Sequence, residues 1–93
     1  MLKKQNNITI VAISDIKIKE TLNSLMISNS KLRPAKTILF TSKPFSLNNK
    51  QAKLIKKIKV KPIKSIKDYS EFVIYYLYKY IETSHILIVQ WDG

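Results

Sequence analysis

The chain has 93 residues, the length of one domain, and 45% of them are apolar, which is enough for a single continuous core. It contains no cysteine, so neither disulfide bonds nor a thiolate zinc site can stabilise it. Its 17 basic and 6 acidic residues give a net charge of +11 and therefore a basic surface. From the length and the lack of cysteine we predict one domain, residues 1–93, held together by packing alone.

The first half of the chain predicts a strand, a helix and a second strand. Residues 8–13 are nearly all apolar and β-branched, a pattern typical of a strand covered on both faces of a parallel sheet. Apolar residues then recur at helical spacing over 16–29, and Ser14 or Asp15 is placed to cap that helix. Residues 36–41 form the second short apolar run.

The middle of the chain is less regular. Residues 45–56 carry two asparagines, and their pattern fits a turn of helix or none. Apolar and charged residues alternate over 58–61, and Pro62 follows, which predicts a strand at the edge of a sheet.

The last third predicts a helix and a final strand. Asp68 and Glu71 have the spacing of a capping box, which predicts that the helix begins there. This helix has one apolar stripe that we expect to be buried, formed by Tyr69, Phe72, Val73, Tyr76, Leu77 and Tyr80. After it, residues 86–89 form the second continuous aliphatic run, the predicted final strand.

The order of elements is β-α-β-β-α-β, so we predict an α/β fold with a small, mostly parallel, Rossmann-like sheet. The first and last strands are the most completely apolar, which favours them as central neighbours. Ligands of such sheets bind beyond the carboxyl ends of the strands, where strand order reverses. We therefore expect Ser14 and Asp15 to lie beside Trp91 and Asp92, at the rim of a ligand crevice.

Candidate chemistry in that crevice is limited to carboxylates. Asp92 is an oxygen ligand suited to Mg²⁺ or Mn²⁺, which could hold a diphosphate, although an aspartate before glycine is also a common turn residue. The turn after the first strand lacks a Gly-rich phosphate loop, which argues against a dinucleotide-binding domain. The single histidine, His85, stands at a strand start, and we interpret it as structural.

The lysine-rich composition has two interpretations. Eight lysines lie between Lys50 and Lys67 before the first following acid, so a nucleic-acid or acidic-surface binding module is one hypothesis. However, Arg33 is the only arginine, and lysine, isoleucine, asparagine and tyrosine supply 42 of the 93 residues, as an AT-rich genome would encode. Because three of the five tyrosines fall on the predicted buried stripe, we favour a solvated lysine face over nucleic-acid binding.

The longest apolar runs, 72–78 and 86–89, are too short to span a bilayer, so we expect no membrane span. Residues 8–13 are likewise too short for the hydrophobic core of a signal peptide. The lack of cysteine fits a reducing compartment, and we expect a soluble cytoplasmic protein.

Parts of the sequence resemble a known family. The run Asp68-Tyr69-Ser70, with Phe72, and the ending from Thr83 to Gly93 are similar to the signature of uncharacterised bacterial and viral proteins related to GT-A glycosyltransferases. The specific part is Gln90-Trp91-Asp92-Gly93, and the first two strands are similar as well.

This resemblance implies the nucleotide-sugar-binding half of a GT-A fold. It places Gln90, Trp91 and Asp92 where GT-A enzymes carry an Asp-x-Asp metal motif, with neutral Gln90 in place of the first aspartate. It also implies that Ala12 to Ser14 border the nucleotide base. The expected nucleotide-binding residues are thus Ala12, Ser14, Asp15, Gln90, Trp91 and Asp92, with Asp92 as the ligand of Mn²⁺ or Mg²⁺.

The family pattern continues beyond the metal motif, where such enzymes build the acceptor pocket and supply any catalytic base. This chain ends one residue after Asp92, so we expect a truncated half-domain that is inactive alone and encodes no catalytic residue. A second chain could complete the fold. The alternative is a structural α/β subunit whose exposed third strand pairs with a partner chain.

Overall fold

The computed structural model describes residues 5–44 and 46–89, with the side chains of residues 5 and 6 left undescribed. It shows an α/β fold with a four-stranded, all-parallel sheet in the order β3-β2-β1-β4. The predicted fold class is thus confirmed. The strands are β1 (Gln5–Ile13), β2 (Pro34–Thr41), β3 (Lys56–Lys59) and β4 (His85–Ile88), and the helices are α1 (Ile18–Leu32), α2 (Asn49–Leu54), α3 (Ile66–Tyr75) and the 3₁₀ helix η1 (Leu77–Tyr80).

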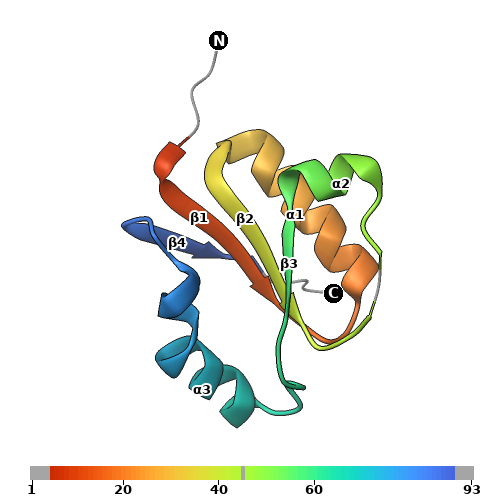
Figure 1. Ribbon diagram of the computed structural model, residues 1–93, viewed down its shortest axis with the longest axis vertical. Coiled ribbons are helices and arrows are strands. Elements are labelled where there is room, and N and C mark those ends of the chain that lie inside the picture. The colour runs from red at the N-terminus through yellow and green to blue at the C-terminus, as the bar shows by residue number, and fades with distance from the viewer. Residues whose placement is uncertain (1–4, 45, 90–93) are drawn as a thin grey trace.

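The helices divide between the two faces of the sheet (Figure 1). The chain first moves outward from β1 to β2 and β3, and then crosses back to the far side of β1 to form β4. Crossovers between parallel strands are right-handed. A connection that runs across the sheet in the opposite direction therefore places its helix on the opposite face. Accordingly, α1 and α2 lie on one face, and α3 lies on the other.

Each face has its own core, supplied by alternate residues of the central strands. On the α1 face, Ile10 and Leu39 are fully buried against Leu22 and Leu25 of the helix. On the α3 face, Phe40 is fully buried, and its ring lies 5.0 Å from that of Phe72 and 5.1 Å from that of Tyr80. These two layers account for the apolar character of both faces of β1 and β2.

The predicted pairing of the first and last strands is confirmed, because β1 and β4 are parallel neighbours with Val11 opposite Ile88. The prediction that both are central is wrong. β2 is the second central strand, and β4 forms an edge at which Ile86, Leu87 and Ile88 are 42%, 40% and 37% exposed. A continuous aliphatic run therefore does not establish burial on both faces.

Two predicted helix caps are also wrong. α1 begins after Lys17, and no side chain caps its first turn within the described residues, because Ser14 and Asp15 bond elsewhere. α3 begins earlier than expected, since Ser65 is the N-cap and accepts a hydrogen bond from the Asp68 backbone N–H at 3.1 Å. In the undecided middle segment, α2 forms behind a capping box of Asn48 and Gln51.

The tyrosine stripe is only partly buried. The α-helix ends at Tyr75 and the 3₁₀ helix η1 follows, so the side chains after Tyr75 no longer follow one line of 3.6 residues per turn. Leu77 remains buried, but Tyr76 is 51% exposed and Tyr80 37% exposed. The run of β-branched and aromatic residues from Phe72 to Tyr76 favours this early end, because such residues have low helix propensity.

Candidate functional site

A crevice of about 830 Å³ lies beyond the carboxyl ends of the strands. It stands where strand order reverses between β1 and β4, the position at which open α/β sheets bind ligands. The end of β1, the end of β4 and the loop between β3 and α3 form its walls. Its lining residues are Ile13, Ser14, Asp15, Ile16, Thr21, Lys43, Pro62, Ile63, Lys64, Ser65, Ile66, Tyr69 and Val89.

Asp15 joins the end of β1 to the loops that follow β2 and β3. Its Oδ1 accepts hydrogen bonds from the Thr41 hydroxyl at 3.0 Å and from the Ser42 backbone N–H at 2.6 Å. Its Oδ2 accepts from the Ser42 hydroxyl at 2.7 Å and from the Ile63 backbone N–H at 2.9 Å. One carboxylate thus fixes the loops that follow β2 and β3 against the end of β1, and it positions two of the three walls of the crevice.

These contacts stabilise the ionised form of Asp15. Partial burial acts to raise the pKa of its carboxyl group, but the hydrogen bonds from Ile63, Ser42 and Thr41 outweigh it and lower the pKa below the ordinary value. Asp15 is therefore ionised at neutral pH, and its oxygens face donors of the protein itself.

Ser14 shapes the turn between β1 and α1. Its hydroxyl donates to the Ile16 carbonyl at 2.7 Å and accepts from the Ile16 backbone N–H at 3.2 Å. Its backbone N–H donates to the Phe40 carbonyl at 3.0 Å, which continues the pairing of β1 with β2. The half-buried Ser14 thus lines the crevice at a position set by three hydrogen bonds.

The remaining predicted site residues lie apart from this wall. The Ala12 side chain is fully buried in the core on the α1 face, and the next residues, Ile13 and Ser14, line the crevice instead. Gln90, Trp91 and Asp92 lie outside the described residues. The preceding residue, Val89, lines the crevice, and its N–H donates to the Val11 carbonyl at 2.8 Å.

Sequence reasoning missed the wall formed by the β3–α3 loop. Ile63, Lys64 and Ser65 reach the crevice because the Ile63 N–H bonds to Asp15, 48 residues earlier in the chain. The one available signal was local: Ser65 stands three residues before Asp68, the spacing of a capping serine. Thr21 and Lys43 carried no signal of their own.

The described residues provide few ligands for a metal ion. No group of three or more His, Asp or Glu side chains that could hold a cation occurs among them. Asp15 is the one carboxylate in the described lining, and four protein donors already occupy it. The sequence-predicted ligand, Asp92, lies outside this part of the chain.

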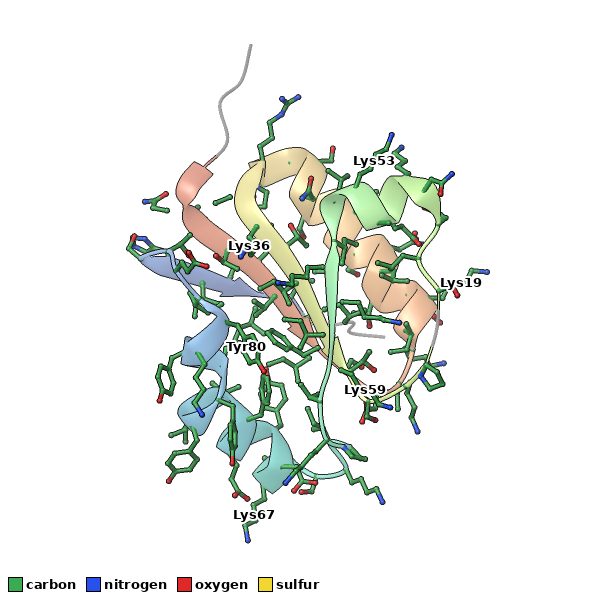
Figure 2. All side chains as sticks on the ribbon, in the orientation of Figure 1. Lys19, Lys36, Lys53, Lys59, Lys67 and Tyr80 are labelled. Carbon is green, nitrogen blue, oxygen red and sulfur yellow. The ribbon has the colours of Figure 1, made fainter. Side chains whose placement is uncertain are left out.

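A second hollow of about 750 Å³ lies between the end of β3 and α3. Lys59, Lys61, Tyr76 and Tyr80 line it together with the acidic Asp68 and Glu71. The exposure of Tyr76 and Tyr80 removes one sequence argument against nucleic-acid binding. Of the labelled lysines, Lys19, Lys53 and Lys67 nevertheless project from different sides of the molecule (Figure 2).

No family model matches the chain, and no curated protein or solved structure is significantly similar to it. Within the described ranges, no helix is both long enough and apolar enough to cross a membrane.

Proposed function

We propose that this chain is the donor-binding half of a glycosyltransferase and that it holds a nucleotide-sugar in the crevice at the carboxyl ends of its strands. The observation that carries the proposal is the parallel pairing of β1 with β4, which brings Ser14 and Val89 to the same crevice. Val89 immediately precedes the Gln90-Trp91-Asp92 run that resembles the GT-A metal motif.

The proposed roles follow from the chemistry of the lining. Lys43 and Lys64 supply positive charge that favours the diphosphate of the donor. Asp92 supplies the carboxylate for Mn²⁺ or Mg²⁺, because Asp15 is already bonded to protein donors. A bound cation would stabilise the charge that develops on the leaving nucleoside diphosphate.

The test uses Trp91, the only tryptophan, as a reporter beside Asp92. We expect Mn²⁺ with UDP to quench Trp91 fluorescence in a saturable way, because Trp91 adjoins the proposed ligand, Asp92, in the sequence and Mn²⁺ is paramagnetic. The Asp92→Asn variant should weaken the Mn²⁺ effect by about tenfold or more, while Asp68→Asn, which lines only the second hollow, should leave it unchanged. Absence of quenching at millimolar UDP and Mn²⁺ would contradict the proposal.

We further propose that a second copy of the chain completes the sheet at the β4 edge. The two edge strands differ in how well they are protected against pairing with another strand. β3 carries Lys56, Lys57 and Lys59, whereas the residues of β4 are His-Ile-Leu-Ile with half-exposed aliphatic side chains. An uncharged, apolar edge is the kind that pairs with another strand.

This pairing predicts a concentration-dependent mass. In analytical ultracentrifugation we expect the 10.8 kDa chain to form dimers that strengthen with added salt, since salt screens the repulsion between two +11 chains. Leu87→Lys should restore the monomer, and Ile74→Lys, a matched change at an exposed position of α3, should not. A wild-type protein that stays monomeric at high concentration and high salt rules the pairing out.

A further inference from the structure

The first turn of α1 adjoins the crevice, because Ile16 and Thr21, on either side of residues 17–20, line it. The helix is 15 residues long, its N-cap is Lys17, and the cap provides no side-chain hydrogen bond. The Thr21 N–H is the first of the helix to bond backward, to the Lys17 carbonyl at 2.9 Å. The N–H groups of residues 18–20 therefore have no acceptor within the helix, and they carry the positive end of its dipole.

Thr21 adds an independent observation at the same place. Its side chain is 1% exposed and lines the crevice, and its hydroxyl has no hydrogen-bond partner among the described residues. The other buried threonines are paired: Thr9 with Thr83 at 2.7 Å, Thr37 with Asn29 at 2.8 Å and Thr41 with Asp15 at 3.0 Å. A buried, unpaired hydroxyl destabilises a protein unless something else satisfies it.

The charged groups around this turn are of both signs. Lys43 and Lys64 line the same crevice and supply positive charge. The negative charges are Glu20, in the first turn of the helix, and Asp15, whose oxygens already accept four hydrogen bonds from the protein. Backbone N–H groups at a helix start, a hydroxyl and two ammonium groups together form the donor set that phosphate oxygens require. Carboxylates would compete less well, because they offer fewer oxygens to a set of this size.

We propose that the first turn of α1, with the Thr21 hydroxyl, binds a phosphate group of the ligand directly and without a metal ion. The proposal deepens the proposed function, since it rests on the same crevice and assigns the phosphate to residues 18–21. It separates phosphate recognition from the cation expected at Asp92, so phosphate binding should persist when divalent ions are removed.

The test is a titration with inorganic pyrophosphate, in the presence of a chelator and at constant ionic strength, followed by ¹H–¹⁵N correlation spectra. We expect the amide signals of Ile18, Lys19 and Glu20 to shift in a saturable way. Thr21→Val should weaken binding by about tenfold while leaving the melting temperature equal to or above that of the wild type, because the hydroxyl it removes has no partner in the free protein.

Thr37→Val is the matched control: it makes the same change at an equally buried threonine that is paired with Asn29 and lies away from the crevice. It should lower the melting temperature and leave pyrophosphate binding unchanged. The phosphate site is refuted if Thr21→Val loses stability as Thr37→Val does, or if the amides of residues 18–20 do not respond.

The same spectra distinguish this inference from the proposed function. Saturable pyrophosphate shifts at residues 18–20 with no response to UDP support the phosphate site and reject the nucleotide. Shifts with UDP that spare residues 18–20 support the nucleotide and reject the phosphate site.

Discussion

Replacing Asp15 with alanine should lower the free energy of unfolding by about 3 kcal/mol, because the change leaves four donors without their acceptor. In a domain of this size that corresponds to a fall in melting temperature of roughly 12 to 24 °C. Asp68→Ala is the control, since Asp68 accepts one exposed hydrogen bond from the Lys64 N–H at 3.0 Å, and it should cost about 1 kcal/mol or less. Thermal unfolding followed by circular dichroism measures both. Equal losses in the two variants would show that Asp15 does not hold the loops.

The lowered pKa of Asp15 gives the same interaction a pH dependence. A carboxyl group whose pKa is lower in the folded than in the unfolded protein contributes stability above the unfolded value. That contribution is lost as pH falls from about 4 toward the folded pKa. The Asp15→Ala variant should therefore lose less stability than the wild type on acidification through this range, and parallel curves would contradict the assignment.

Replacing Phe40 with alanine should destabilise the protein by about 3 to 5 kcal/mol, a large part of the total stability of a small domain. Phe40 is fully buried, and its ring contacts Phe72 of α3 and Tyr80 of η1, so its loss leaves a cavity under both segments. Denaturant unfolding should show a much lower midpoint, together with loss of near-ultraviolet tyrosine signal. Tyr78→Ala, at a side chain that is 65% exposed, should change stability by less than about 0.5 kcal/mol.

The sequence was sufficient for most of the fold because hydrophobic periodicity reports directly on burial. It predicted β1, α1 and β2, and also the parallel pairing of β1 with β4. It failed for the environment of β4, because an aliphatic run has the same pattern at a sheet edge as in the centre. It also failed after Tyr75, where periodicity continues but the helix changes from α to 3₁₀.

The crevice was predictable in position but not in construction. Topology alone places it at the carboxyl ends of β1 and β4. The role of Asp15 could not be predicted, because an aspartate before a helix can either cap that helix or accept hydrogen bonds from distant residues. Only the folded chain brings Ser42 and Ile63 within reach of its carboxylate. Likewise, nothing in the sequence distinguishes Thr21 from other helix residues. Its burial and the lack of a hydrogen-bond partner for its hydroxyl among the described residues are known only from the structure.

We propose that the carboxyl edge of the sheet is a nucleotide site. The most direct test is to record backbone amide spectra while the protein is titrated with UDP in the presence of a diamagnetic Mg²⁺ salt. We predict saturable shifts confined to Ser14, Ile16, residues 18–21 and the segment 63–65, with residues 35–37 at the opposite edge unchanged. Shifts concentrated on the lysines of β3 and the exposed tyrosines, or none at millimolar UDP, would contradict it.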